Sequence, residues 1–563
     1  MRNYHCQHQT EKTMQSASRR RRLLRLFGLV AACLASMPAA ASRVVYLAEQ
    51  EFAFVPELYI ADLETPGKPI RLNRPLSPFS IGVASFAISP DGARIAFSAD
   101  QDRADDWDLY LVDITALGGW TRIGDLAPGH QEVFAKFSPE GSKLAFTASD
   151  ASFGNVELYV VDLARPTEAV RINGNLADGG SVSLTGFEFS PDGRRVVYVA
   201  GELERKYELY VVDLAEPGRS TRLNAPGGSV GDSYEGRFAL LDDGERVIYS
   251  AVGDKPGVRE LHMVAIDSPA RPATLNAPLQ SEGDIFDFAV SPDGRFVAYT
   301  ADQETDSLEV FLVDIEVPGV ATKLNGPVQT GAGLAAFTPD GRYVIYAGDE
   351  ERGPNERDLY RVAVEAPTIR LRLNTPPGSG ADIGPFSISP DGRHVVYAPA
   401  QTDGFRRDLM VVGVDAPGTD FKVNGPLPDG TLDLFPRPTF DPAGEAIVFI
   451  AVESLDDSAQ ELFFASLSEP GRSIRLNAPM PEEAMVVTIP GSFAFLPAGA
   501  PPTGQAPPGS RPDEPRTESG GGGSLGVLGV LLMLAGLIGR RRPRAGWRQV
   551  THKVSDFAHF LGA

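Results

Sequence analysis

Carboxylate side chains recur at one position of a repeated sequence unit, which makes them the residues best placed to act together. Each begins a short acidic-Leu-aromatic or related segment, such as Glu157-Leu158-Tyr159. The nine carboxylates are Glu57, Asp108, Glu157, Glu208, Glu260, Glu309, Asp358, Asp408 and Glu461. In equivalent units they would form a ring of like charge that could bind a cation or a basic peptide. We favour the alternative that duplication has repeated a solvated strand start.

A second acidic residue follows five positions later in several units, and a basic residue follows nine positions after it. The acids are Asp62, Asp113, Asp162, Asp213 and Asp314, and the bases are Arg71, Arg122, Arg171, Arg222 and Lys323. If a hairpin turn lies midway, each acid faces its base across two strands and gains up to about 1 kcal/mol. One unit has lost both partners, as Ala265 and Thr274. The pattern therefore predicts structural ion pairs.

Two acidic loops are the candidates for calcium binding. One holds Asp100, Asp102, Asp105 and Asp106, and the other holds Asp302, Glu304 and Asp306. An EF-hand loop requires a central glycine and a distal glutamate at fixed spacing, and neither loop has them. We assign no metal site and no cofactor.

Catalytic groups are sparse in the body of the chain. His130, His262 and His394 fall in separate units, and the only cysteines are Cys6 and Cys33. Residues 522–526 match the hydrolase pattern G-x-S-x-G, but they lie in a Gly-rich stretch and not between a strand and a helix. We therefore assign no catalytic residue and expect the protein not to be an enzyme.

Internal repetition shows which elements must position these side chains. The motif Ser89-Pro90-Asp91-Gly92 recurs in recognisable form with its last glycine at 92, 141, 193, 244, 294, 341, 392 and 444. Proline at the second position and glycine at a positive φ predict a tight hairpin turn. The turn residues that we single out are Asp91, Gly92, Asp192, Gly193, Asp293, Gly294, Asp391 and Gly392.

Each unit of about fifty residues contains four short segments with the alternation of half-buried strands, which is typical of a propeller blade. The fold class is therefore all-β, a single β-propeller of four-stranded antiparallel blades over residues 42–499. Residues 43–47 match a second strand and residues 493–499 match a first strand and its turn, so the two ends should share one blade. Counting that blade gives nine, and eight blades with an irregular repeat is the alternative.

An asparagine ends the fourth strand of most units. These residues are Asn73, Asn173, Asn224, Asn276, Asn325, Asn374, Asn424 and Asn477. We predict that the neutral amide binds the backbone of the turn between blades.

The repeats resemble the TolB-type, WD-like propeller repeat, which also forms the propeller of prolyl-oligopeptidase relatives. The resemblance rests on four Ser-Pro-Asp-Gly motifs, at residues 89–92, 190–193, 291–294 and 389–392. It covers nearly the whole body and implies the fold, whereas propellers have many functions. The domain that precedes the propeller in TolB is missing, so no role in that envelope system is implied.

The N-terminus has the order of a secretory signal peptide, predicted over residues 1–41. Arginines 19–22 form a basic region, an apolar run follows, and Ala39-Ala40-Ala41 predicts cleavage by signal peptidase between Ala41 and Ser42. Residues 30–33 also match a lipobox, so lipidation of Cys33 is an alternative.

The C-terminus has the order of a membrane anchor. A Pro-rich linker (500–519) precedes the sorting segment at 520–544, which holds Gly520, Gly521, Gly522, Gly523 and Ser524, an apolar run, and Arg540, Arg541 and Arg542. This order resembles the GlyGly-CTERM sorting signal of Gram-negative bacteria, which implies a rhomboid-like protease as a partner. The basic tail at 545–563 departs from that pattern and is unassigned, and cleavage of the anchor is left open.

The charge of the body limits the partners. Residues 1–42 and 521–563 together hold 13 of the 52 basic residues but 2 of the 74 acidic ones, so the remainder carries a formal charge of −33. Such a body repels nucleic acid. We expect an exported propeller, tethered to the membrane or released at the surface, that binds an envelope protein or a glycan through its loops. The alternatives are a propeller enzyme, such as a glycan lyase, glycan hydrolase or metal-dependent esterase with a site in the central channel, and a self-associating structural protein.

Overall fold

The computed structural model describes residues 42–503, apart from short stretches at 77–78, 103–105, 125–130, 150–154, 177–179, 203–205, 226–227, 231–237, 253–256, 281–282, 377, 379–381, 401–404, 428–430, 434–436, 453–458, 482–483, 489–490, 498 and 502. The predicted signal peptide, including Ala41, lies outside the described residues, as do nearly all of the linker, the sorting segment with Gly520–Ser524 and Arg540–Arg542, and the tail. No helix long and apolar enough to cross a membrane occurs among the described residues.

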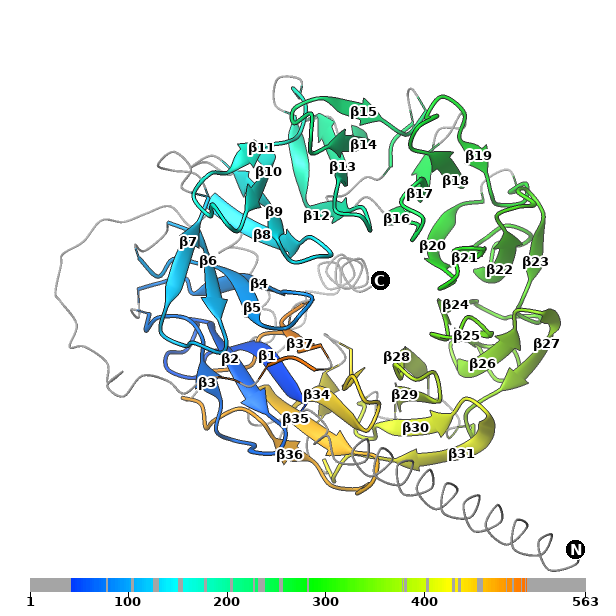
Figure 1. The fold of residues 1–563 in the computed structure, drawn as a ribbon. Coiled ribbons are helices and arrows are strands. Elements are labelled where there is room, and N and C mark those ends of the chain that lie inside the picture. Colours follow the sequence, from blue (N-terminus) through cyan, green and yellow to red (C-terminus); the bar gives the residue numbers. More distant parts are fainter. Residues whose placement is uncertain are drawn as a thin grey trace, which may run out of the picture. The chain divides into compact units, whose positions relative to one another are not determined.

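The described chain folds into nine antiparallel sheets that stand side by side around a ring (Figure 1). We number them as blades 1 to 9 along the chain and give the strands of each from the innermost outward. Blade 1 consists of β37 (Phe493–Phe495), β1 (Arg43–Ala48), β2 (Glu57–Asp62) and β3 (Ile70–Arg71). Blade 2 consists of β4 (Val83–Ile88), β5 (Arg94–Ala99), β6 (Asp108–Asp113) and β7 (Trp120–Ile123). Blade 3 consists of β8 (Gln131–Phe137), β9 (Lys143–Ser149), β10 (Val156–Asp162) and β11 (Val170–Arg171).

The next three blades repeat this order. Blade 4 consists of β12 (Ser181–Phe189), β13 (Arg195–Glu202), β14 (Lys206–Asp213) and β15 (Ser220–Arg222). Blade 5 consists of β16 (Phe238–Leu240), β17 (Arg246–Val252), β18 (Arg259–Ala265) and β19 (Ala273–Thr274). Blade 6 consists of β20 (Ile285–Val290), β21 (Phe296–Ala301), β22 (Glu309–Asp314) and β23 (Ala321–Lys323).

The last three blades have longer or interrupted strands. Blade 7 consists of β24 (Ala332–Phe337), β25 (Tyr343–Gly348), β26 (Asp358–Ala363) and β27 (Ala366–Arg372). Blade 8 consists of β28 (Ile383–Ile388), β29 (His394–Pro399), β30 (Met410–Gly413) and β31 (Ala416–Lys422). In blade 9 the innermost strand is split into β32 (Thr431–Asp433) and β33 (Thr439–Phe440), which both pair with β34 (Ala446–Val452), followed by β35 (Glu461–Ser466) and β36 (Ile474–Arg475).

The two ends of the described chain close the ring in one blade, as the sequence predicts. Strand β37 pairs antiparallel with β1, with Val45 opposite Ala494. Because the C-terminal strand covers the inner edge of β1, β1 is not left as the edge of its sheet. Closure also includes Ala500, which we placed in the linker: its carbonyl accepts a hydrogen bond of 2.9 Å from the Arg43 guanidinium. The count of nine blades is confirmed.

The cores of the ring lie between adjacent blades and not within them. Nine clusters of buried side chains fill the nine interfaces, and the one that contains Val44 and Val448 joins blade 9 to blade 1. In eight blades an aromatic ring of the second strand contacts a ring of the third, as Phe97 and Tyr110 do at 5.6 Å between centroids. Both faces of each sheet are buried. Successive residues of a strand therefore contact the two neighbouring blades in turn, instead of a core on one side and solvent on the other.

The Ser-Pro-Asp-Gly motif forms the turn between the first and second strands, as predicted. Gly92 has a φ of 66°, and Gly193, Gly294 and Gly392 have φ values of 67°, 71° and 71°. In the first turn the Ser89 hydroxyl donates to Asp91 at 2.6 Å, and the amide of residue 93 donates to the same carboxylate oxygen. The motif therefore encodes a hydrogen-bonded turn and no ligand site.

These turns give stability a defined pH dependence. The hydrogen bond from serine is the main cause that lowers the pKa of Asp91, and the same holds for Asp192 and Asp293. A lowered pKa in the folded state means that the stabilisation is present above the ordinary Asp pKa of about 3.9 and is lost as pH falls through the folded value.

We therefore expect an Asp91→Asn, Asp192→Asn and Asp293→Asn triple variant to lose less stability than the parent as pH falls from about 5 to 3. Urea denaturation midpoints across that range measure the effect. Equal pH slopes for the parent and the variant would contradict it.

A repeated hydrogen bond links the outer strands of neighbouring blades. Some blades have a Pro-Gly turn between the third and fourth strands, and the amide of its glycine is the donor. The acceptor is a backbone carbonyl in the blade before it, on the residue immediately before the repeated asparagine. This occurs for Gly67 with Leu476, Gly218 with Ile172, Gly319 with Leu275, Gly418 with Leu373 and Gly471 with Val423, at 2.7–3.2 Å. The bond from Gly67 to Leu476 joins blade 1 to blade 9. The Pro-Gly pairs thus serve the assembly of the ring as well as the local turn.

Candidate binding face of the propeller

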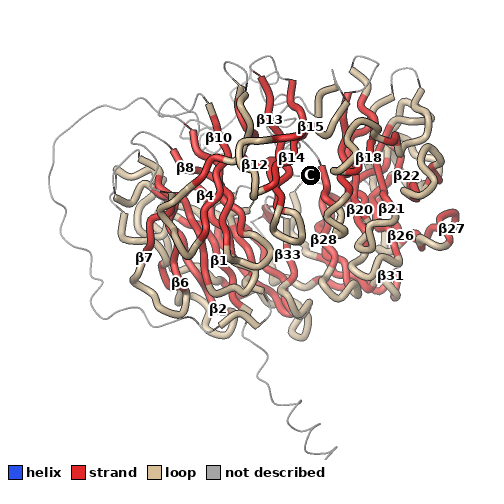
Figure 2. Tube along the Cα trace, turned by 45° about the horizontal axis from the view of Figure 1, so that its top comes forward, coloured by secondary structure: helices blue, strands red, loops and turns tan. Residues whose placement is uncertain are grey.

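Antiparallel pairing places the connections of every blade on two opposite faces (Figure 2). One face carries the connections between first and second strands and between third and fourth strands, and we call it the turn face. The other face carries the connections between second and third strands and those that lead to the next blade, and we call it the loop face. All eight first-to-second connections that lie within a repeat have five residues. The second-to-third connections range from three residues at 203–205 to ten at 400–409.

The nine repeated carboxylates lie at the base of the loop face, and eight of them pair with a base on the outermost strand. The partners, fourteen residues apart, are Glu57 and Arg71, Asp108 and Arg122, Glu157 and Arg171, Glu208 and Arg222, Glu309 and Lys323, Asp358 and Arg372, Asp408 and Lys422, and Glu461 and Arg475. Several of the carboxylates are buried, among them Glu57, Glu309 and Asp358. The interpretation of these residues as solvated strand starts is therefore wrong, although they do form a structural set.

The predicted pairing of the second acid with the base is also wrong. Tyr59, and not Asp62, lies opposite Arg71 in the register of β2 and β3. Because diagonal neighbours lie two residues away, the Arg71 side chain reaches back to Glu57 on the same face of the sheet. Asp62 instead accepts the backbone amide of residue 64 at 2.8 Å on the turn face. The same turn occurs at Asp113, Asp162, Asp213 and Asp314.

Blade 5 departs from this pattern. Glu260 keeps the position of the carboxylate, but Thr274 replaces the base and His262 replaces the tyrosine. His262 stacks on Tyr249 at 5.5 Å between ring centroids and its Nδ1 lies 3.3 Å from the Thr274 hydroxyl. The histidine therefore occupies the packing position of an aromatic residue, as the sequence predicts.

The asparagine of the fourth strand fastens the third strand to the connection between blades. In all eight blades that have it, Oδ1 accepts the backbone amide of the residue fifteen positions earlier, at 2.7–2.9 Å. Its Nδ2 donates to the carbonyl of the next residue at 2.6–3.3 Å. The prediction of a backbone role is confirmed, with one further partner on the third strand.

The acidic loops that were candidates for calcium binding use their carboxylates internally. Asp100 accepts the amides of residues 81 and 82 at 2.8 and 3.0 Å, and so holds the connection to its own blade. Asp102 pairs with Arg74, and Glu304 pairs with Lys323. Asp105 lies outside the described residues. Across the described part of the chain, no group of three or more His, Cys, Asp or Glu side chains is arranged to hold a metal ion.

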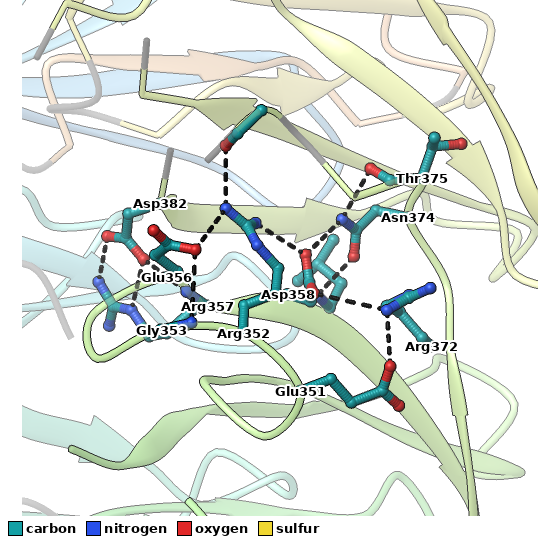
Figure 3. A network of polar contacts seen from close by, with 12 residues as sticks. Glu351, Arg352, Gly353, Glu356, Arg357, Asp358, Arg372, Asn374, Thr375 and Asp382 are labelled. Carbon is teal, nitrogen blue, oxygen red and sulfur yellow. Dashed lines mark hydrogen bonds and ion pairs between the residues drawn. The ribbon is translucent and has the colours of Figure 1, made fainter. Parts of the chain in front are cut away.

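A polar network on the loop face centres on blade 7 and reaches blade 8 (Figure 3). The Arg352 guanidinium binds Asp358 at 3.2 Å, Glu356 at 3.2 Å and the carbonyl of residue 378 at 3.0 Å. Arg357 forms a two-pronged pair with Asp382 of blade 8, at 3.0 and 2.8 Å. The network therefore attaches the loop at 349–357, between β25 and β26, to blade 8. Arg352 has a local partner in Glu356, four residues away, but Arg357 pairs with a residue of the next blade, and no spacing rule identified these contacts.

The buried ion pairs provide a stability test. Burial raises the pKa of the Glu57 carboxyl against the opposing effect of Arg71, and burial has the same effect at Asp108 against Arg122. A base beside such a carboxylate therefore offsets its desolvation. In blade 6, Glu309 is 1% exposed and its partner Lys323 is 27% exposed.

We expect Lys323→Met to lower the free energy of unfolding by about 1–3 kcal/mol, because it leaves a buried carboxylate without its cation. Lys143→Met is the matched control, since its pair with Glu140 is exposed on both sides and should contribute less than about 1 kcal/mol. Equal losses in chemical denaturation would show that burial does not set the contribution of these pairs.

A hollow of about 220 Å³ lies between blades 8 and 9, and residues such as Gly425, Phe449, Phe463, Arg472 and Ser473 line it. Its lining contains no carboxylate and no histidine. Two of the three histidines of the body lie in separate blades, His262 in blade 5 and His394 at the start of a strand of blade 8, and His130 lies outside the described residues.

Comparisons with known proteins show the fold. No protein-family model matches the chain, and no curated protein matches it. A solved structure of a eukaryotic initiation factor is 11% identical with a TM-score of 0.51, over 81% of this chain and 99% of that one. An oligogalacturonate lyase in complex with manganese is 16% identical with a TM-score of 0.39, over 76% and 98%.

A prolyl endopeptidase is 15% identical with a TM-score of 0.40, over 64% of this chain and 55% of that chain, so this chain spans about half of its length. TolB from Acinetobacter baumannii is 19% identical over 59% of this chain and 63% of that one, with a TM-score of 0.27. These proteins have different functions, and at such identities the likeness extends to architecture alone. The described chain is a nine-bladed β-propeller.

Proposed function

We propose that the protein is an exported binding or scaffold module that contacts its partner through the loop face. The observation that supports this most strongly is the contrast between two kinds of connection, although the third-to-fourth connections of the turn face also vary, from two to seven residues. Connections between first and second strands keep one length, while those between second and third strands vary more than threefold in length. Variable loops on a rigid frame are where binding functions concentrate.

The frame beneath those loops is held firmly. The Asn amides, the Glu–Arg pairs and carboxylates such as Asp100 and Asp349 bind backbone amides or bases at the loop bases. A loop on such a base can change its sequence without disturbing the blade. Partners that contact several loops at once would be protein or glycan surfaces.

Site-specific photo-crosslinking in cells that produce the full chain tests this proposal. A photoreactive residue would replace an exposed glutamate of the loop face, Glu304 or Glu351, or an exposed glutamate of the turn face, Glu216 or Glu316. We expect a discrete crosslinked species from the loop-face positions and none from the turn-face positions. Crosslinks from the turn face alone, or from neither face, would overturn the proposal.

We further propose that signal peptidase cleaves after Ala41 and that the C-terminal segment anchors the protein in the membrane until a rhomboid-like protease releases it. The support is the order of the sequence features at the two ends. The intact mass of the protein from native membranes gives both cleavage positions. A mass that retains residues 1–41 would overturn export by this route.

A further inference from the structure

Each innermost strand has a residue at the same place in the repeat, two positions before the turn that leads to the second strand. We call these nine residues the wall positions. Strand pairing defines these nine wall positions, because each lies opposite an equivalent residue of its second strand. They are Ala87, Lys136, Glu188, Ala239, Ala289, Ala336, Ser387, Thr439 and Ala494. Seven are small and uncharged. The two that are not lie on adjacent blades and carry opposite charges.

Lys136 and Glu188 both reach solvent from the inner wall. Each is exposed, although each belongs to an innermost strand, β8 or β12, at the centre of the ring (Figure 1). The Lys136 ammonium lies 5.3 Å from the centroid of the Phe187 ring, which belongs to blade 4. The side chain therefore extends from blade 3 across the inner wall toward blade 4.

The two charges influence each other without forming a contact. The crowding of the surrounding blades lowers the pKa of Lys136, and the nearby Glu188 carboxylate opposes that shift. Within the described residues, neither charged group takes part in a hydrogen bond or an ion pair. Lys136 has an aromatic neighbour but, among these residues, no anion at contact distance, so its ammonium is open to an anionic group of a ligand.

Packing does not require these charges. The equivalent positions of the other seven blades hold Ala, Ser or Thr, and the interfaces there are closed by the same kind of buried cluster. Two adjacent exceptions of opposite sign, at positions that are otherwise small and neutral, form a polarised pair.

We propose that Lys136 and Glu188 form a binding site for a small zwitterionic ligand on the inner wall, at its turn-face end. The ligand carboxylate binds the Lys136 ammonium, and the ligand ammonium binds the Glu188 carboxylate. A simple anion is repelled by Glu188 and a simple cation by Lys136, whereas a ligand with both charges satisfies both groups. This site lies at the opposite end of the strands from the loop face and does not depend on the function proposed for that face.

Titration calorimetry on the full chain with glycine, β-alanine, 4-aminobutanoate and 5-aminopentanoate tests the site. These probes carry the same two charges at increasing separation, so the tightest binder also reports the distance between the two protein charges. Butanoate and butylamine are the controls with one charge each. We expect saturable binding of at least one zwitterion, at about tenfold or higher affinity than either control.

Variants assign the binding to the two residues. Lys136→Met and Glu188→Gln are each expected to weaken the best probe by about tenfold or more, while Ser387→Ala, at an equivalent wall position, leaves it unchanged. The exchange Lys136→Glu with Glu188→Lys keeps one charge of each sign and should restore binding. Unfolding temperatures show whether each variant is folded. Absence of saturable binding by every zwitterion, or binding that neither single variant weakens, would overturn the proposal.

Discussion

Replacing Phe493 and Leu496 with alanine is expected to open the ring and to cause the largest loss of stability of any pair of substitutions at the chain ends. Both side chains are buried in the closing blade, Phe493 against blade 9 and Leu496 against blade 2. Truncation of a buried Phe or Leu costs about 2–5 kcal/mol at each site. The double variant also weakens the strand that covers β1, so it should expose an edge that can pair with another molecule.

Chemical denaturation measures the loss, and sedimentation measures the association. Phe286→Ala is the matched control, because Phe286 also lies on an innermost strand but is 48% exposed. We expect that control to change the free energy of unfolding by less than about 1 kcal/mol. A double variant that is as stable and as monomeric as the control would mean that the shared blade does not hold the ring closed.

Asn173→Ala is expected to lower the free energy of unfolding by about 2–4 kcal/mol, although asparagine is a polar residue. The side chain is fully buried, and its Oδ1 accepts the amide of Leu158 at 2.8 Å. Its Nδ2 donates to the carbonyl of Gly174 at 3.0 Å. Removal of the amide leaves a buried N–H and a carbonyl without partners and creates a small cavity.

Asn175→Ala is the control, since Asn175 lies two residues away, is exposed and interacts with the side chain of Arg171. Its substitution should change stability by less than about 0.5 kcal/mol. Urea denaturation of both variants gives the comparison. Similar values for the two would indicate that the repeated asparagine does not fasten the blade.

Several features of the fold could be predicted because they depend on local chemistry. A turn with proline at the second position and glycine at the fourth requires a positive φ there, and Gly92 adopts it. The complementary strands at the two ends predicted the shared blade, because an incomplete blade would expose edges. Because each weak signal is repeated, eight turns and one composite unit favoured nine blades, with eight as the alternative that the structure excludes.

The ion pairs were predicted with the wrong partners because register is not visible in spacing alone. The position of a turn decides which residues face each other, and here it places Arg71 opposite Tyr59. The long side chain then reaches a diagonal neighbour, so Glu57 and not Asp62 becomes its partner. The burial of several of these carboxylates could not be predicted either, since it depends on how the surrounding strands and loops pack.

The polar network of blade 7 was missed for a related reason. Arg357 pairs with Asp382, which belongs to the next blade, and Arg352 reaches a carbonyl at residue 378. Such contacts join residues that the repeat places in different units. No local pattern relates them, because the angle between blades determines which side chains meet.

The amino-acid sequence by itself determined the repeat, the turns and the closure by the chain ends, because each follows from backbone geometry within about fifty residues, whereas the choice of nine blades over eight came from the structure. Tertiary structure alone decided which carboxylates are buried, which bases pair with them and which residues line the inner wall. Lys136 and Glu188 illustrate the difference: in the sequence they are two charged residues of separate units. They become neighbours because adjacent blades bring equivalent positions together around the axis of the ring.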